Sequence, residues 1–326
     1  MIQIVKPGIL IDFVAKFKIA IGISLLLILI GVGNLIMQGG PKLGIEFKGG
    51  TSIQLQFDKP IKVTELRKAV SSIKTFKDSR IQSFGGTNQQ FIIYTKASTS
   101  STTKNIEGEL KQALDKYFHS GYKIMKVDMV GPKIGKEFRD KGIEAVIIAL
   151  IAILIYISIR FQYRFALGAI TALFHDVLIT VGFLSLFGYE FTLDVVAAIL
   201  TIVGYSINDT IVIYDRIREK VKNNRKLSNV EAINKGVSET LSRTILTAGT
   251  TLFVVLALYL FGGHALKGMS FALLVGIISG TYSSIFIASP VLLIFKGPLI
   301  PEKKEVDSAD RFKQQIEFDM KNIRGN

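Results

Sequence analysis

Six runs of mostly apolar residues constrain this 326-residue chain more than any other feature. Each run is close to the ~20 residues that an α-helix needs to cross the hydrocarbon core of a bilayer. The runs cover approximately 19–37, 143–159, 165–187, 195–213, 244–261 and 271–295. We therefore predict an α-helical polytopic membrane protein with six transmembrane helices, in which the last helix kinks or ends near Pro290.

The first apolar run has a competing interpretation as a cleaved signal peptide, because Lys16 and Lys18 precede it. The run is long for the apolar core of a signal peptide, and no A-x-A-like cleavage site follows it. An uncleaved first transmembrane helix over 19–37 is the favoured prediction.

The distribution of Lys and Arg predicts the orientation of the chain in the membrane. Basic residues precede the first run, lie between the second and third, and crowd the loop between the fourth and fifth. By the positive-inside rule, the N-terminus (1–18) and the tail (296–326) are cytoplasmic. The basic segment 38–141 is then extracytoplasmic, and it is too long for its charges to count in that rule. The net charge of +14 therefore indicates membrane loops and lipid contact, and no nucleic-acid partner is predicted.

The segment 38–141 has the pattern of a small α+β domain. Residues 51–57 alternate between apolar and polar, and strands are also predicted over 80–84, 90–95 and 122–130. Helical spacing is present at 63–72 and 106–118, with a Ser/Thr-rich loop at 97–103. The order β-α-β-β-α-β predicts a ferredoxin-like extracytoplasmic domain, followed by a five-helix transmembrane bundle over 142–295.

An acidic residue, Asp209, interrupts the fourth apolar run. A charge at the centre of a bilayer costs roughly 2.5–3.5 kcal/mol on insertion scales, so such a residue is a functional-site hypothesis by default. Helical spacing gives two rows on this helix: Asp209 with Tyr205 and Ser206, and Thr201 with Gly204 and Asn208. The small, polar second row is expected to pack against other helices. The alternative is that Asn208 and Asp209 only form hydrogen bonds to a neighbouring helix.

Arg243 is the predicted partner of Asp209. It begins the fifth run and is followed by a hydroxyl-bearing row that includes Thr247 and Thr251. Because an Arg side chain keeps its proton, it would act as a fixed positive charge that favours ionised Asp209. The alternative is an interfacial Arg that merely obeys the positive-inside rule.

His175 and Asp176 lie midway along the third run and form a rival site. Two ionisable groups at this depth could act as a proton relay or a gate. They could equally brace a contact between helices.

The chain contains no Cys and three His, which excludes disulfides and thiol catalysis and makes a His-rich metal site improbable. The Walker pattern and a serine–histidine–acid pattern are absent from the sequence. No metal, cofactor or enzymatic activity is predicted.

Several motifs resemble the SecF family, the smaller subunits of bacterial SecD–SecF protein-export complexes and relatives of the resistance-nodulation-division transporters. Residues 43–51 (LGIEFKGGT) look like the entry to the family's outer domain, where the family more often has Asp at the position of Glu46. Residues 203–210, followed by 214–219, are similar to the family's fourth-span signature. Residues 239–244 resemble the start of its fifth span, and 174–176 resemble an acid-bearing stretch of its third span.

The resemblance implies a function that spacing alone does not show. Such proteins act in the inner membrane with a SecD-like subunit and the SecYEG channel, and they use the proton gradient to help move unfolded preproteins outward. The family's proton-pathway acid and arginine map onto Asp209 and Arg243. Two alternatives remain: a small-molecule or lipid efflux subunit of the same superfamily, or a structural membrane scaffold.

Overall fold

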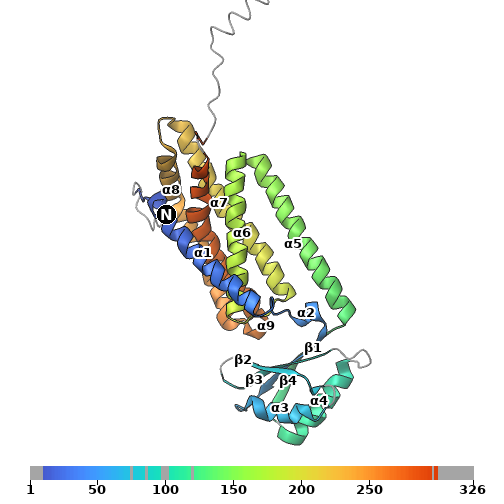
Figure 1. Cartoon of the computed structure of the whole chain (residues 1–326). Helices are drawn as coiled ribbons and strands as arrows, with labels where there is room; N and C mark the ends of the chain where they lie inside the picture. The colour runs from blue at the N-terminus through green and yellow to red at the C-terminus, as the bar shows by residue number, and fades with distance from the viewer. Residues whose placement is uncertain are drawn as a thin grey trace, which may run out of the picture.

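The structure is a computed structural model that describes residues 10–73, 76–84, 87–96, 103–118, 121–295 and 297–299. It consists of a helical bundle and a small α+β domain at one end of that bundle (Figure 1). The expectations for 1–9, for most of the loop 97–103 and for nearly all of the tail 296–326 lie outside the described residues.

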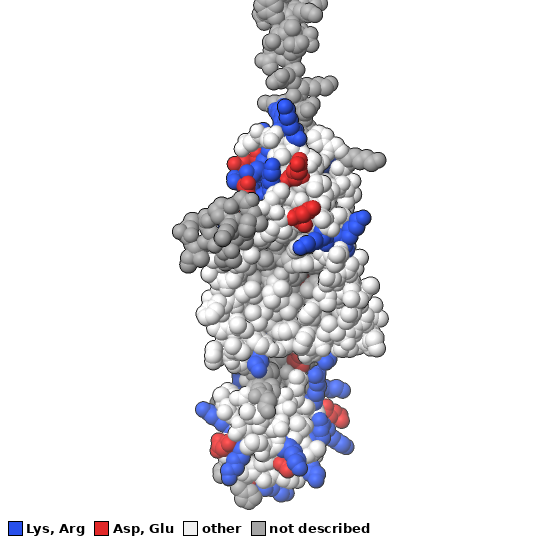
Figure 2. Space-filling model, turned by 90° about the vertical axis from the view of Figure 1, so that its left-hand side faces the viewer, with Lys and Arg blue, Asp and Glu red and all other residues white. Residues whose placement is uncertain are grey.

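Six helical stretches are long and apolar enough to cross a membrane, as the sequence predicts. They are α1 (Phe13–Met37), α5 (Pro132–Arg160), α6 (Tyr163–Leu186), α7 (Leu193–Asn223), α8 (Asn229–Phe261) and a sixth stretch, Ala265–Ile294, that begins within α9 (Gly263–Ser283). Figure 2 shows a belt without Lys, Arg, Asp or Glu around the middle of the visible face, as a bilayer-spanning region requires.

Several helices extend well beyond the apolar runs. The helix α5 begins at Pro132, about three turns before the apolar run at 143. The helix α8 begins at Asn229, where the Ser228 side chain accepts from the Glu231 N–H and the Glu231 side chain accepts from the Ser228 N–H. Hydropathy locates the part of a helix that crosses the bilayer, whereas capping residues such as these decide where the helix starts.

The last span is interrupted near Pro290, as predicted. After α9 the chain forms a π-helical segment, Ser284–Ala288, then α10 (Ser289–Val291) and a 3₁₀ turn, Leu292–Ile294. The Ser289 hydroxyl donates to the Ser284 carbonyl at 2.9 Å and so satisfies a backbone group inside the irregular segment.

Glycines allow the central helices of the bundle to pack closely. A Cβ on Gly31 of α1 would lie 2.6 Å from Cα of Gly182 in α6, and a Cβ on Gly280 of α9 would lie 2.9 Å from Cβ of Ser206 in α7. About half of each apolar window in α6, α7 and the sixth stretch is buried, against 6% in α5 and 17% in α1 and α8. The core of the bundle therefore lies between α6, α7 and α9.

The α+β domain contains a four-stranded sheet in the order β2-β3-β1-β4. Its strands are β1 (Gly50–Phe57), β2 (Arg80–Phe84), β3 (Gln90–Thr95) and β4 (Tyr122–Val130), and neighbouring strands are antiparallel. The helices α3 (Val63–Ser71) and α4 (Thr103–Phe118) contribute Leu66, Leu110 and Leu114 to one apolar core with Ile53 and Leu55 of β1. The element order and strand positions agree closely with the sequence prediction.

The connection between the α+β domain and the bundle contains a short helix, α2 (Ile45–Lys48), that periodicity did not predict. Just before it, the Gly44 N–H donates to the Phe191 carbonyl at 2.7 Å, and the Phe191 N–H donates to the Lys42 carbonyl at 2.7 Å. Gly49 has φ +73° and lies against Pro132 of α5. We call this contact region, formed by residues 42–50 against residues 190–194 and the start of α5, the junction.

Candidate functional site

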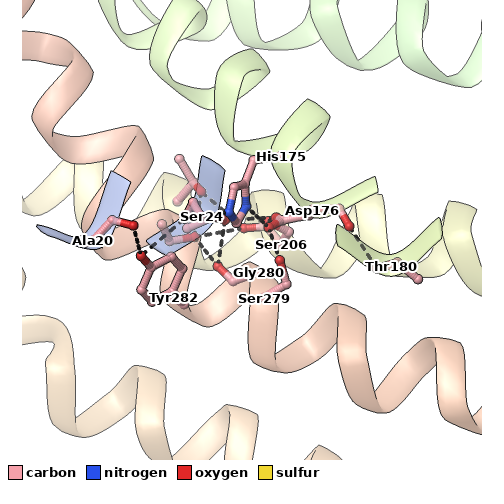
Figure 3. A network of polar contacts seen from close by, with 12 residues as sticks. Ala20, Ser24, His175, Asp176, Thr180, Ser206, Ser279, Gly280 and Tyr282 are labelled. Carbon is pink, nitrogen blue, oxygen red and sulfur yellow. Dashed lines mark hydrogen bonds and ion pairs between the residues drawn. The ribbon is translucent and has the colours of Figure 1, made fainter. Parts of the chain in front are cut away.

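Buried polar side chains from four helices meet around Asp176 in the middle of the bundle. We call this set the Asp176 cluster; it consists of Ser24 of α1, His175 and Asp176 of α6, Ser206 of α7, and Ser279 and Ser283 of α9 (Figure 3). Asp176 is 0% exposed. Polar side chains inside a membrane-spanning bundle must form hydrogen bonds with groups of the protein, because the lipid hydrocarbon has no donors or acceptors.

Both carboxylate oxygens of Asp176 are satisfied by the cluster. Ser206 and Ser283 donate to Oδ2 at 2.6 Å and 2.8 Å. Ser279 donates to Oδ1 at 2.7 Å, and His175 Nδ1 lies 3.0 Å from the same oxygen. Because a carboxylate has about four acceptor sites, these contacts fill its capacity.

Hydrogen-bond directions around His175 define how many protons the cluster holds. Tyr282 donates its hydroxyl proton to the Ala20 carbonyl at 2.6 Å, and Ser24 donates its own to Tyr282 at 3.2 Å. Ser24 must therefore accept from His175 Nε2, which lies 3.0 Å away and carries a proton. A second proton lies between His175 Nδ1 and Asp176 Oδ1, because two acceptors facing each other would repel. The His175–Asp176 pair is thus neutral overall, either as imidazolium and carboxylate or as imidazole and carboxylic acid.

Close helix packing positions the cluster. Ser279 and Ser283 are four residues apart and so lie on one face of α9, toward α6. Gly280 lies between them and allows α9 to approach Ser206 of α7. The ring of Tyr282 stacks on His175, with 5.9 Å between the centroids.

Asp209 lies on α7 three residues beyond Ser206, outside the Asp176 cluster. It is 4% exposed, and its Oδ2 has no hydrogen-bond partner among the described residues. The structure therefore places a second buried acid in the bundle with part of its acceptor capacity unused.

Arg243 does not form an ion pair with Asp209. Its side chain is exposed on α8, and the ion pairs found among the described residues, with N···O distances up to 4.0 Å, do not include one between Arg243 and Asp209. Arg243 nevertheless acts on Asp209 as a nearby positive charge. The predicted pair is thus brought into the same region without direct contact.

The predicted supporting residues occupy two environments. Ser206 is buried in the Asp176 cluster, and the Tyr205 hydroxyl donates to Thr251 of α8 at 3.3 Å. The row of Thr201, Gly204 and Asn208 is exposed, and so is Thr247, whose hydroxyl donates to the Arg243 and Thr244 carbonyls at 3.0 Å each. The expectation that this small, polar row packs against other helices is therefore not met within the chain. The reason is that α8 and α9 pack on other faces of α7, and a Cβ on Gly204 would meet nothing within 4 Å.

Sequence reasoning missed most of the hydroxyl donors to Asp176. Ser279 and Ser283 stand at helical spacing in the sixth apolar run, and this pattern could have identified them. Ser24 stands alone in the first run and gave no such signal. The contact between the Thr210 and Ser284 hydroxyls, at 2.8 Å, was also missed because it depends on the π-helical segment. Among the described residues, no group of three or more His, Asp or Glu could hold a metal ion.

The fold and the site define a class: a six-span α-helical membrane protein with acids buried in its bundle and an α+β domain after its first span. Two family profiles match the chain. The profile described as "Protein export membrane protein SecD/SecF, C-terminal" matches residues 109–297, and "SecD/SecF GG Motif" matches residues 35–61. The chain belongs to the SecD/SecF family of protein export membrane proteins.

Similar proteins agree with this assignment over nearly the whole chain. The protein translocase subunit SecF of Calditerrivibrio nitroreducens is 43% identical, over 91% of this chain and 97% of that protein. The protein translocase subunit SecF of Vibrio alginolyticus is 37% identical, over 95% of this chain and 98% of that protein. The chain is thus an auxiliary subunit of the Sec preprotein translocase and a multi-pass protein of the inner membrane.

Solved structures of SecDF have the same fold over most of this chain. SecDF from Thermus thermophilus, described as a translocon-associated membrane protein, matches with a TM-score of 0.79 and 35% identity, over 89% of this chain and 39% of that chain. SecDF in a super-membrane-facing form matches with a TM-score of 0.65 and 34% identity, over 91% of this chain and 40% of that chain. This chain therefore spans about two fifths of the SecDF chains.

Proposed function

We propose that this chain couples the proton gradient to late steps of preprotein export, in complex with a SecD-like subunit and beside the SecYEG channel. Its role is non-enzymatic: it responds to protonation with a change of conformation, which assists the outward movement of an unfolded preprotein. A SecD-like partner is supported by the likeness to SecDF, in which the matching region is one part of a longer chain.

The observation that carries this proposal is the environment of Asp209. A buried carboxylate oxygen without a partner, inside a membrane-spanning helix, is costly to keep ionised. That cost is the condition under which a carboxylate takes up a proton readily. Asp209 is therefore the group that we assign to the proton pathway, with Arg243 as the charge that favours its ionised form.

The exposed row beside Asp209 is the surface that we assign to the SecD-like partner. Gly204 and Asn208 are exposed on α7, the helix that carries Asp209, and Thr247 is exposed on α8 one turn after Arg243. Small and polar residues of this kind allow close helix contact and hydrogen bonding between helices in a membrane. The partner would thereby cover the side of the bundle where Asp209 and Arg243 lie.

The energy available is sufficient for such coupling. Moving one charge through the membrane potential supplies about 2.3 kcal/mol per 100 mV. A free-energy bias of that size changes the ratio of two conformations by tens of fold, because about 1.4 kcal/mol corresponds to a factor of ten.

The orientation and the finer fold belong to the same proposal. Both termini are assigned to the cytoplasm and residues 38–141 to the opposite side, on the positive-inside pattern. We assign the α+β domain to the ferredoxin-like fold, which the strand order β2-β3-β1-β4 and the antiparallel pairing support.

The test is export in proteoliposomes that contain the chain, its SecD-like partner and SecYEG. Asp209→Asn is expected to assemble normally and to lose the stimulation of export by an imposed proton gradient. Asp215→Asn is the matched control on α7, because its side chain is 43% exposed, and it should keep the stimulation. Full gradient-dependent export by Asp209→Asn would refute the proposal, and stimulation by a sodium gradient alone would reassign the coupling ion.

A further inference from the structure

Glu46 of α2 lies in the junction between the α+β domain and the helix bundle. Its Oε2 is buried without a hydrogen-bond partner among the described residues. A Cβ on Gly44 would overlap Glu46 Oε2 and would come within 3.2 Å of the Phe191 carbonyl oxygen. The carboxylate is thus enclosed between the connecting segment and the loop that joins α6 to α7.

The charged groups that act most strongly on Glu46 are three acids, and they lie on three different elements around it. Asp194 lies at the start of α7, Asp128 lies on β4, and Glu190 lies in the loop between α6 and α7. The ionised form of a carboxyl group is disfavoured in this setting, because like charges lie nearby and the group is partly removed from water.

Glu190 provides an instructive contrast within the same junction. Its carboxylate lies 3.7 Å from Arg80 Nη1 on β2, and it forms a hydrogen bond with the Tyr94 hydroxyl on β3. Lys42 and Lys48 also act on Glu190 as positive charges. Glu190 therefore joins the α+β domain to the bundle by opposite charge and hydrogen bonding, whereas Glu46 faces acids.

Burial raises the pKa of Glu46 and the neighbouring acids raise it further, whereas a hydrogen bond with its own backbone lowers it in part. Burial also raises the pKa of Glu190, although Tyr94 and Arg80 lower it in part. The pKa of both groups is raised at the junction, so both bind a proton more readily when the α+β domain is in contact with the bundle than when they face water.

We propose that Glu46 is a proton-binding site at the junction, and that a proton on Glu46 favours contact between the α+β domain and the helix bundle. This site is separate from Asp209 and from the Asp176 cluster, which lie inside the membrane-spanning bundle. It would sense the pH on the side of the membrane that carries the α+β domain, and its readout is the position of that domain.

The direction of the effect follows from linkage. A carboxyl whose pKa is higher in the docked state stabilises that state at low pH, and this contribution is lost as pH rises through the docked pKa. Low pH on the side of the α+β domain therefore favours docking, and higher pH favours separation.

The experiment measures the distance distribution between two spin labels in the full chain, reconstituted in lipid. The sequence has no Cys, so labels can be placed on Lys59→Cys in the α+β domain and Ala265→Cys at the nearby end of α9; both residues are exposed. Spectra are recorded at about pH 5 and about pH 8, a range that covers the titration of a carboxyl with a raised pKa.

We expect the docked population, in which the α+β domain contacts the bundle, to fall several-fold from the lower to the higher pH. Glu46→Gln, a neutral isostere, should lose most of this fall and keep only the part that comes from Glu190. Glu107→Gln is the matched control, because Glu107 is exposed on α4 and should leave the pH response intact. The proposal is overturned if the distribution does not change with pH, or if Glu46→Gln responds as strongly as the control. Because this readout needs neither export nor a partner, it is independent of the proposed role of Asp209.

Discussion

Ser283→Ala tests whether the hydroxyls of α9 stabilise a charged or strongly polar Asp176. The substitution keeps the Cβ and removes a hydroxyl that donates to Asp176 Oδ2 at 2.8 Å, in a place with 0% exposure for both residues. Ser206 remains as a donor to the same oxygen, but one acceptor site of the carboxylate is left empty. The hydrocarbon core of the bilayer contains no water that could replace the lost hydrogen-bond donor.

The expected loss in the free energy of unfolding is about 1.5–3 kcal/mol, the range for a hydrogen bond to a charged group. Neutral hydrogen bonds between membrane helices average about 0.6 kcal/mol in double-mutant cycles, so the two cases can be distinguished. The measurement is reversible unfolding in mixed detergent, followed by far-ultraviolet circular dichroism. Thr250→Ala is the control, because its exposed hydroxyl donates only to the Thr247 carbonyl of its own helix, and its effect should be close to zero.

A double-mutant cycle with Asp176→Asn separates the contact from general packing. If Ser283 acts through the carboxylate, Ser283→Ala should cost much less in the Asp176→Asn background than in the unmodified chain. Equal costs in the two backgrounds, or a single-variant loss near that of Thr250→Ala, would refute a stabilising hydrogen bond between Ser283 and the Asp176 carboxyl group.

Two further predictions concern glycines. Gly182→Val should destabilise the chain by about 1–3 kcal/mol through overpacking, because a Cβ there would lie 3.0 Å from Cα of Gly31. Gly33→Val is the control, because a Cβ at Gly33 meets nothing within 4 Å. Equal midpoints of detergent unfolding for the two variants would contradict the close contact between α1 and α6. Gly204→Leu should keep the fold of the chain but prevent co-purification with the SecD-like subunit. Gly22→Leu on α1 is the control and should co-purify normally, because a Cβ at either glycine meets nothing within 4 Å of the same chain. Retention of the partner by Gly204→Leu would show that the partner binds elsewhere.

The spans and strands were predictable because they depend on local patterns. Apolar runs of sufficient length located all six spanning stretches, and the alternation in 51–57 located β1. The short helix α2 was not predictable, because four residues carry no measurable periodicity. It is held by the Gly44–Phe191 backbone contacts and by packing on α5, which are tertiary interactions.

The site was predictable in its acids but not in their roles. Asp176 and Asp209 stand out in apolar runs because a buried acid is costly in a membrane, and helical spacing placed Ser206 on the face of α7 that carries Asp209. Which acid Ser206 serves depends on the crossing of α6 and α7, and the structure assigns it to Asp176. Likewise, the sequence places Arg243 at the start of an apolar run, but the exposed position of its side chain follows from how α8 packs.

The difference between the two acids favours Asp209 over Asp176 as the group that exchanges protons. Both oxygens of Asp176 already have two hydrogen-bond partners each, and the His175–Asp176 pair already shares a proton, so a further proton has to break one of these hydrogen bonds, at about 1.5–3 kcal/mol where a charged group is involved. A proton on Asp209 Oδ2 breaks none, because that oxygen has no partner among the described residues. The Asp176 cluster joins α1, α6, α7 and α9 and would hold them together through a cycle in which Asp209 changes charge. Ser206 and Asp209 are one turn apart on α7, so this helix is held at the cluster next to the acid that we assign to the proton pathway. We therefore expect a change of charge at Asp209 to act on the exposed face of α7 that carries Gly204 and Asn208.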